Sequence, residues 1–412
     1  MTSSDRPTTD PAALPPPTFV DTQRGLDEML ARLADEPTIA VDTEADSFFA
    51  YRESVCLIQL TAGGSDYVLD PLAKVDLDGL GALLADEARV KIFHDGEYDV
   101  LIFKRNYGFE FRNLFDTRVA AATLGSKTPG LASVLEERFG VQLDKSQQRS
   151  NWAKRPLTRE QIQYARLDTH YLIRLRELML ADLEAAGRLA ILEGECRRLE
   201  GLEPPVRPFD AEEFARIKGA RQLPSTAWAP LRELYVWRER EAERRNLPPF
   251  KVLANPILLE LATLAPESPS ELRRVRSLPE KLRQRLGGEL LAALTRARAS
   301  GPMERFPRLP AKDGTTDFGD AEHELHDRAK AWRRRRAEQE DLDSSLILHR
   351  TTILDLALRK PRSRAEVEAL DGIVPWQVEA YADRIIALVE KFERELAAGE
   401  IDFTKRRRAR RG

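Results

Sequence analysis

A short apolar segment that leads directly into two carboxylates places the strongest constraint on this chain. Residues 38–41, Thr-Ile-Ala-Val, form a β-branched run typical of a strand buried on both faces. The strand ends at Asp42 and Glu44, which are separated by one residue. Because side chains two apart in an extended backbone point to the same side, both acids leave the strand in one direction. This arrangement is unfavourable unless a cation lies between the acids, although a simple polar turn is the alternative.

Another acid follows the short apolar strand expected at residues 90–93. Apolar residues at helical spacing after it predict a helix with Asp99 in its first turns. An acid there also has an ordinary explanation, because it stabilises the helix dipole. His94, at the end of the strand, is left outside the catalytic set, since a histidine in such a place more often makes a structural hydrogen bond.

A later helix, predicted for residues 157–172, supplies the remaining acid. Thr158 and Gln161 fit a capping box at its start. Tyr164 and Asp168 are four residues apart and therefore lie on one helical face. An aspartate inside a helix is intrinsically unfavourable and needs a partner if it faces inward.

Taken together, Asp42, Glu44, Asp99 and Asp168 match the chemistry of a divalent metal site. Two Mg²⁺ or Mn²⁺ ions about 4 Å apart need about this many carboxylates, with other positions left to water and phosphate oxygens. Such a pair activates a water and stabilises the attacking and leaving oxygens of a phosphoryl displacement. We expect Tyr164 to orient this water and not to act as the base, because an unperturbed phenol has a pKa near ~10.

A polar and basic segment at residues 140–157 precedes the last acid. Its cations, amides and single tryptophan suit contacts to a phosphate backbone and a stacked base, and a solvated loop is the alternative. The candidate nucleic-acid contacts are Gln148, Arg149, Trp152, Lys154 and Arg155.

Three motifs now resemble those of the DEDD superfamily of exonucleases, in its tyrosine-containing branch. They are Val-Asp-Thr-Glu44, His-Asp-Gly-Glu-Tyr-Asp99 and Tyr-Ala-Arg-Leu-Asp168. Residues 148–157 resemble the stretch before the last motif in bacterial ribonuclease D, and the resemblance covers roughly residues 19–180. Gln163 stands where the histidine-containing branch carries its histidine, which excludes that variant.

This resemblance implies an α/β, ribonuclease H-like fold with a mixed sheet flanked by helices. It also implies 3′→5′ exonucleolytic release of nucleoside monophosphates. By the same resemblance, the four acids would bind two divalent metal ions, Mg²⁺ or Mn²⁺, and Tyr164 would position the water.

The second half of the chain is helical and contains an internal repeat. Trp237-Arg238 matches Trp332-Arg333 at an offset of 95 residues (332 minus 237), and further matches keep this offset without a gap. Two copies of one helical unit are therefore expected, at residues 210–300 and 320–395. Each resembles an HRDC domain, which implies either auxiliary nucleic-acid binding or a packing role that shapes the entrance to the exonuclease. The basic runs at residues 333–336 and 405–411 are electrostatic candidates for phosphate contacts.

Composition narrows the remaining choices. The 412 residues include 65 basic and 68 acidic side chains, with a formal net charge of -3, so nucleic-acid binding has to come from local patches. Only Cys56 and Cys196 are present, far apart in the sequence, which favours a reducing compartment and argues against a structural zinc site. With no apolar run of membrane-spanning length, the sequence predicts a cytoplasmic protein without a membrane or an obligate protein partner.

The predicted organisation has six parts. Residues 1–18 form a disordered leader, 19–205 the exonuclease domain, 210–300 the first HRDC domain, 301–319 a linker, 320–395 the second HRDC-like domain and 396–412 a basic tail. The predicted activity is a metal-dependent 3′→5′ exoribonuclease that trims RNA 3′ ends, such as those of tRNA precursors. A DNA exonuclease on the same site and a catalytically silent nucleic-acid-binding protein are the alternatives, and the complete set of acids disfavours the second.

Overall fold

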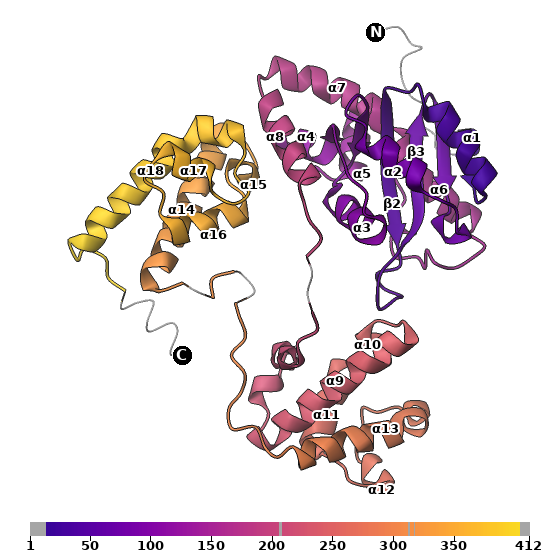
Figure 1. Ribbon diagram of the computed structural model, residues 1–412, viewed down its shortest axis with the longest axis vertical. Helices are drawn as coiled ribbons and strands as arrows, with labels where there is room; N and C mark the ends of the chain where they lie inside the picture. The colour runs from indigo at the N-terminus through magenta and orange to yellow at the C-terminus, as the bar shows by residue number, and fades with distance from the viewer. Residues whose placement is uncertain (1–13, 206–207, 312–313, 317, 404–412) are drawn as a thin grey trace. The chain divides into compact units, whose positions relative to one another are not determined.

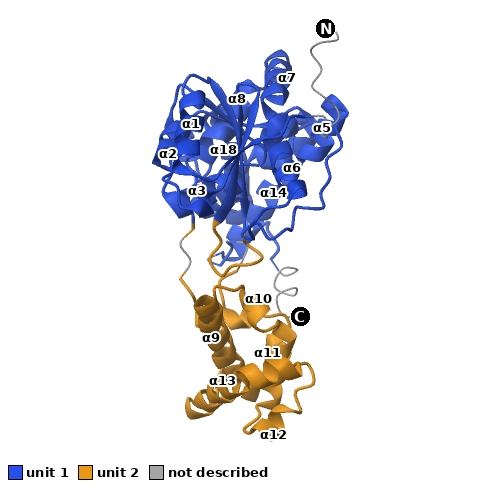
Figure 2. Ribbon diagram, turned by 90° about the vertical axis from the view of Figure 1, so that its right-hand side faces the viewer, with its two compact units in different colours: residues 1–45, 55–204, 312–412 blue, residues 46–54, 205–311 orange. Residues whose placement is uncertain are grey.

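The computed structural model describes residues 14–205, 208–311, 314–316 and 318–403 (Figure 1). The chain divides into two compact units (Figure 2). One contains residues 1–45, 55–204 and 312–412, and the other contains residues 46–54 and 205–311. The start of the predicted leader, residues 1–13, and the basic run at 405–411 lie outside the described residues.

A mixed sheet forms the centre of the first unit, as the sequence predicts. Within the described residues its strands are β1 (Thr18–Val20), β2 (Thr38–Ala45), β3 (Val55–Ala62), β4 (Ser65–Leu69), β5 (Val90–Phe93) and β6 (Leu114–Asp116). They are arranged in the order β1-β4-β3-β2-β5-β6. β3 runs antiparallel to both β2 and β4, whereas the pairs β1–β4, β2–β5 and β5–β6 are parallel. β2, which carries the first two acids, is therefore an interior strand.

Helices pack against this sheet (Figure 1). They are α1 (Gln23–Leu33), α2 (Asp78–Ala85), α3 (Glu97–Tyr107), α4 (Thr117–Thr123), α5 (Leu131–Phe139), α6 (Arg159–His170), α7 (Leu172–Ala185) and α8 (Leu189–Glu200). The predicted capping box of α6 is confirmed, because Thr158 accepts from the Gln161 amide and the Gln161 side chain accepts from the Thr158 amide. Asp116 caps α4 by accepting from the amides of Arg118 and Val119.

The prediction of a disordered leader is wrong for residues 14–18. Leu14 packs against the apolar core of the sheet, and the Pro15 carbonyl accepts a hydrogen bond from the Arg166 guanidinium. Thr18 begins β1, which pairs with β4. A strand of three residues is too short to show a period in the sequence, and its order depends on β4 and α6.

The second copy of the helical repeat belongs to the same compact unit as the sheet. It contains α14 (Asp320–Glu340), α15 (Ser344–Ile347), α16 (Arg350–Arg359), α17 (Arg364–Glu368) and α18 (Pro375–Ala397). Arg188 joins it to the exonuclease part, since its guanidinium donates to the carbonyls of Thr123 (2.7 Å) and Glu340 (2.8 Å). Ala122, at the end of α4, contributes to its apolar core.

The first helical unit has its own apolar core. It contains α9 (Trp228–Arg245), α10 (Pro249–Val252), α11 (Asn255–Leu264), α12 (Pro269–Leu272) and α13 (Glu280–Ala299), preceded by short 3₁₀ turns at Ala211–Arg216, Ala220–Gln222 and Ser225–Ala227. The loop between β2 and β3, residues 46–54, groups with this unit and not with the sheet, which interrupts the predicted range 19–205. The Tyr51 hydroxyl donates to Glu239 at 2.6 Å, and the Lys251 ammonium lies 3.8 Å from the centre of the Phe49 ring.

The repeat is confirmed by matching hydrogen bonds. Arg238 donates to the Leu253 carbonyl at 3.0 Å, and Arg333 donates to the Leu348 carbonyl at 3.1 Å. Both residues of the second pair lie 95 positions after those of the first (333 minus 238, 348 minus 253). The same offset relates the helix-capping serines Ser268 and Ser363, and the left-handed residues Asn246 with Asp341 and Ala265 with Lys360.

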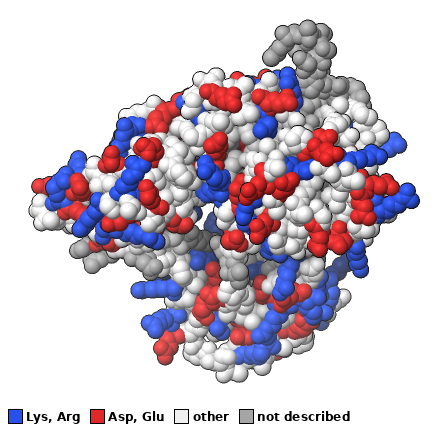
Figure 3. All heavy atoms as spheres, turned by 45° about the horizontal axis from the view of Figure 1, so that its top comes forward, with Lys and Arg blue, Asp and Glu red and all other residues white. Residues whose placement is uncertain are grey.

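Charges of both signs are interspersed on the face shown in Figure 3, as the small net charge predicts. Both cysteines are buried free thiols. None of the helices in the described residues is long and apolar enough to cross a bilayer.

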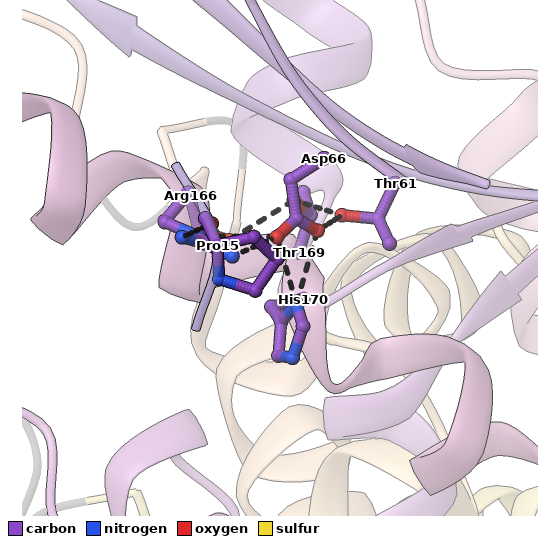
Figure 4. A network of polar contacts seen from close by, with 6 residues as sticks. All are labelled: Pro15, Thr61, Asp66, Arg166, Thr169 and His170. Atoms are coloured by element: carbon purple, nitrogen blue, oxygen red, sulfur yellow. Dashed lines mark hydrogen bonds and ion pairs between the residues drawn. The ribbon is translucent and has the colours of Figure 1, made fainter. Parts of the chain in front are cut away.

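One ion-pair network fixes α6 on the sheet (Figure 4). Arg166 donates from Nε to Asp66 on β4 at 3.1 Å, and His170 Nδ1 lies 2.8 Å from the same carboxylate. Thr61 on β3 donates to Asp66 at 2.8 Å and lies 2.8 Å from the Thr169 hydroxyl. Because these contacts hold the carboxyl-terminal half of α6 on β3 and β4, they also determine where its remaining face points.

We predict that replacing Arg238 by Met destabilises the first helical unit. The Leu253 carbonyl would lose a charged donor inside the protein, which should lower the free energy of unfolding by about 2 kcal/mol. Urea unfolding followed by circular dichroism measures this change. The matched control is Arg240→Met, on the exposed side of the same helix, where a change within about 0.5 kcal/mol is expected. Equal losses in both variants would contradict the role of the buried hydrogen bond.

A second prediction concerns the pH dependence of stability. Burial raises the pKa of Asp66, but hydrogen bonds from His170 and Thr61 and the charge of Arg166 outweigh it, so the pKa lies below its ordinary value of 3.8. The ionised carboxylate therefore stabilises the fold above this value, and the contribution is lost as the pH falls below it.

Asp66→Asn should accordingly lower the free energy of unfolding by about 3 kcal/mol near neutral pH. The difference from the wild type should shrink once the pH falls below 3.8. Urea titrations near neutral pH and below pH 3.8 test this. Asp182→Asn is the control, because the Asp182–Arg138 pair is partly exposed at the surface and should contribute little to stability. A difference that does not depend on pH would contradict the prediction.

Candidate active site

The first two acids lie inside β2 and not beyond its end. The strand continues to Ala45, so Asp42 and Glu44 are held by pairing with β3. Both side chains point to the face of the sheet that α6 covers, since they occupy alternate positions of one strand. The extended pairing therefore fixes both carboxylates on a rigid element.

Asp99 approaches the site from the opposite face of β2. It is buried in the first turn of α3 and accepts a hydrogen bond from Thr43, the residue between the two acids. The sequence analysis missed Thr43, although its position between two acids on a strand directs it to the other face. Thr43 thereby links the third carboxylate to the strand that carries the first two.

The mutual electrostatic effects of the four acids show that they converge. Burial, followed by the charges of Asp99, Asp168 and Glu44, holds the pKa of Asp42 well above its ordinary range. Burial and the same neighbouring aspartates raise the pKa of Glu44 to about 9. Burial raises the pKa of both Asp99 and Asp168 to about 7; for Asp168 the charge of Asp99 adds to it. All the predicted acids are therefore brought together, at a cost in electrostatic energy.

A cavity of about 390 Å³ opens at this point. Asp42, Glu44, Tyr164 and Asp168 line it, whereas Asp99 is not part of its wall. The amino-terminal end of α5, at residues 130–133, lines the cavity together with Arg118, Lys145 and Gln148. Backbone amides at a helix start and two cations favour an anion such as a phosphate next to the carboxylates.

The donor chemistry fits a hard divalent cation. Carboxylate oxygens are the ligands that Mg²⁺ and Mn²⁺ prefer, and a cation would relieve the repulsion that raises the acids' pKa values. In the described part of the chain, however, no three His, Cys, Asp or Glu side chains are gathered closely enough to coordinate a metal ion.

Tyr164 lies on the wall of the cavity, one helical turn before Asp168. Burial and the neighbouring charges of Asp168, Glu44 and Asp42 raise the pKa of its phenol. The hydroxyl group therefore stays protonated at neutral pH and is a hydrogen-bond donor, not a base. The role of Tyr164 in orienting a water stays a prediction.

The prediction of nucleic-acid contacts is wrong for two residues of the basic segment. Trp152 is only 1 % exposed and packs with Leu57, Val68 and Ala165, so it offers no face for stacking on a base. The Arg155 guanidinium pairs with Asp70 and donates to the carbonyls of Cys56 and Trp152. Both side chains fasten the segment to the sheet. Gln148 lines the cavity, and Arg149 and Lys154 are exposed.

His94 lines the same cavity. Its Nδ1 lies 2.9 Å from the Thr117 hydroxyl, which itself donates to the Phe93 carbonyl, so Nδ1 carries the proton. Burial lowers the pKa of His94 to about 4, and the ring is neutral at neutral pH. The contact with Thr117 is structural, as the sequence analysis expected.

Comparison with known proteins identifies the same two kinds of domain that the sequence motifs predict. A family model for 3′-5′ exonucleases matches residues 17–184, and the HRDC domain model matches residues 229–294 and 322–389. The chain is 31% identical to ribonuclease D of Nitrobacter hamburgensis over 374 residues, which cover 90% of this chain and 94% of that protein. It is 34% identical to ribonuclease D of Escherichia coli over 68% of this chain and 76% of that protein.

A solved structure supports the same assignment. The crystal structure of Escherichia coli RNase D, an exoribonuclease involved in structured RNA processing, matches with a TM-score of 0.63 and 27% identity. The match covers 91% of this chain and 99% of that one. Exonucleases with these motifs depend on metal ions. The chain belongs to the ribonuclease D family and is a 3′→5′ exoribonuclease with two HRDC domains.

Proposed function

We propose that Asp42, Glu44, Asp99 and Asp168 bind two divalent metal ions, Mg²⁺ or Mn²⁺, and that this site hydrolyses the terminal phosphodiester at the 3′ end of RNA. The convergence of the four carboxylates beside a cavity is the observation that supports this proposal most. In the reaction, water adds to phosphorus and the bond to O3′ of the preceding nucleotide breaks. A nucleoside 5′-monophosphate and a shortened RNA result.

The residues of the chain would divide the work as follows. Bound divalent ions would supply activation of water and stabilisation of charge on the phosphate oxygens. Tyr164, which keeps its proton, would hold the water in line with the phosphorus by hydrogen bonding. Thr43 would keep Asp99 oriented toward the site. The amino-terminal end of α5, with Arg118 and Lys145, would favour the negative phosphate in the cavity.

The substrate proposal goes one step further, to structured RNA 3′ ends such as those of tRNA precursors. Gln148 on the cavity wall and the exposed Arg149 and Lys154 remain candidates for backbone contacts, together with the HRDC domains. We further propose that the protein acts in the cytoplasm, because buried free thiols at Cys56 and Cys196 suit a reducing compartment. We also propose that it acts without an obligate protein partner.

The activity is tested with matched RNA and DNA that carry the same 3′ extension, in Mg²⁺, Mn²⁺ or EDTA. We expect a ladder of 3′-shortened RNA that EDTA abolishes. Asp42→Asn should reduce the rate by roughly 10²-fold or more, because the site loses a charged ligand. Asp182→Asn, at an exposed ion pair in α7, is the control and should leave the rate unchanged.

The other outcomes distinguish the alternatives. Equal trimming of the DNA would favour a DNA exonuclease on the same site, since sugar discrimination depends on contacts to the 2′-hydroxyl. Tight RNA binding without any shortening would mean that the protein is a binder whose acids are structural. Activity that survives EDTA would exclude the proposed metal site.

Tyr164→Phe tests the role of the phenol separately. Loss of one hydrogen bond to the water should lower kcat by about 10-fold while the metal concentration for half-maximal rate stays the same. Tyr235→Phe, in the first HRDC domain, is the matched control. A shift in metal dependence without a change in kcat would place Tyr164 among the groups that hold the metal.

A further inference from the structure

Gln59 lies directly beside the first catalytic acid. It is in the middle of β3, where its backbone pairs with Asp42 on β2 and with Val68 on β4. Residues directly opposite each other in an antiparallel pair project to the same face, with Cβ atoms about 5 Å apart. The Gln59 side chain therefore lies on the face that α6 covers, next to the Asp42 carboxylate.

The amide of this side chain is buried and unpaired. Gln59 is 0% exposed, and neither its Nε2 nor its Oε1 has a hydrogen-bond partner among the residues that the structure describes. An amide inside a sheet is unfavourable unless it is hydrogen-bonded, and a leucine or valine would fit the same place without this cost. The cost indicates that Gln59 is kept for something other than packing.

Few neighbouring side chains can form a hydrogen bond with the Gln59 amide. Leu57, two positions before it on β3, and Val68 are apolar and pack together under α6. Thr61, two positions after it, donates its hydroxyl proton to Asp66 and contacts Thr169. Asp42 is the polar residue that the strand pairing places directly opposite Gln59, and it is an acceptor that needs donors when it is ionised.

A donor without a partner lies in the same apolar cluster. The indole nitrogen of Trp152 is buried and makes no hydrogen bond to any described residue. Trp152 packs against Leu57 and Val68, which flank Gln59 on two sides.

We propose that Gln59 is a positioning residue for Asp42: in the metal-bound protein its amide nitrogen, which is unpaired in the structure, donates to one carboxylate oxygen and orients the other toward the metal. The proposal rests on the function proposed above. A donor at this place stabilises the ionised carboxylate and fixes its rotamer, whereas the other three acids repel it. Gln59 thus acts through Asp42 and does not touch the metal or the RNA.

Metal binding without RNA gives a readout that is independent of turnover. Mn²⁺ affinity is measured by isothermal titration calorimetry on the full chain for the wild type, Gln59→Met and Asp42→Asn, and urea unfolding is measured on each. Met keeps the length of the side chain and removes the amide. We expect Gln59→Met to weaken Mn²⁺ binding by about 10-fold. Its stability should equal or exceed that of the wild type, because two unpaired buried polar atoms are gone.

Thr352→Val is the matched control. Thr352 is also 0% exposed, and its hydroxyl also makes no hydrogen bond within the described residues, but it lies in α16 of the second HRDC domain. This variant should bind Mn²⁺ as the wild type does. If Gln59→Met does not fold, Gln59→Leu is measured in its place, and failure of both to fold would overturn the proposal by making Gln59 a structural residue.

The possible outcomes distinguish a failure of the role proposed for Gln59 from a failure of the metal site itself. Equal Mn²⁺ affinity in the wild type and Gln59→Met would overturn the role of Gln59 and leave the metal site intact. Equal weakening in Thr352→Val would also overturn it, since the effect would then follow from packing in general. Absence of Mn²⁺ binding in the wild type, with or without Asp42→Asn, would instead refute the metal site itself.

Discussion

Repulsion among four carboxylates is the constraint on which the rest of this structure depends. Burial raises the pKa of Asp42, Glu44, Asp99 and Asp168, and for all but Asp99 the charges of others among these four acids raise it further. Each acid is therefore carried by an element that is fastened elsewhere. β2 is an interior strand, α3 is joined to it by the bond from Thr43 to Asp99, and α6 is fixed by Asp66. The stability of the apolar core and of the Asp66 network maintains an arrangement that becomes favourable only with a cation.

Much of this site could be predicted because its chemistry is local in the sequence. The two acids of β2 are one residue apart, Tyr164 and Asp168 are one helical turn apart, and the capping box at Thr158 marks where that helix begins. Resemblance to known motifs then joined the distant segments. The contacts that could not be predicted connect residues far apart in the chain. Arg155 reads as a phosphate contact until its partner Asp70 is known, 85 positions earlier, and Trp152 reads as a stacking platform until Leu57 and Val68 are seen to cover it. A sequence shows the type of a side chain, whereas exposure depends on tertiary packing.

In the helical half of the chain, too, local features could be predicted from the sequence and distant contacts could not. Its repeat was visible because one offset of 95 residues persists without a gap, and the structure gives the physical reason. Arg238 and Arg333 each donate to the carbonyl of the residue that ends the short second helix, Leu253 after α10 and Leu348 after α15, and a serine caps the fourth helix in both copies. An insertion would separate donor from acceptor, so spacing is preserved where composition is not. The association of residues 46–54 with the first copy has no such signature, because it depends on single contacts such as that of Tyr51 with Glu239.

Two buried polar residues on the α6 face of β3 differ in whether the protein itself satisfies their hydrogen bonds. Thr61 is satisfied within the protein by Asp66 and Thr169, so its role is complete when the chain folds. Gln59, two positions earlier on the same face, is not satisfied within the described residues. A local conflict with good packing that persists in an otherwise consistent core is expected at a functional site, where a side chain serves a catalytic group and not the packing. Asp42 stands opposite Gln59, and burial together with the charges of the other three acids raises its pKa. The two unfavourable features are adjacent and of complementary polarity, and binding a cation at Asp42 would relieve both.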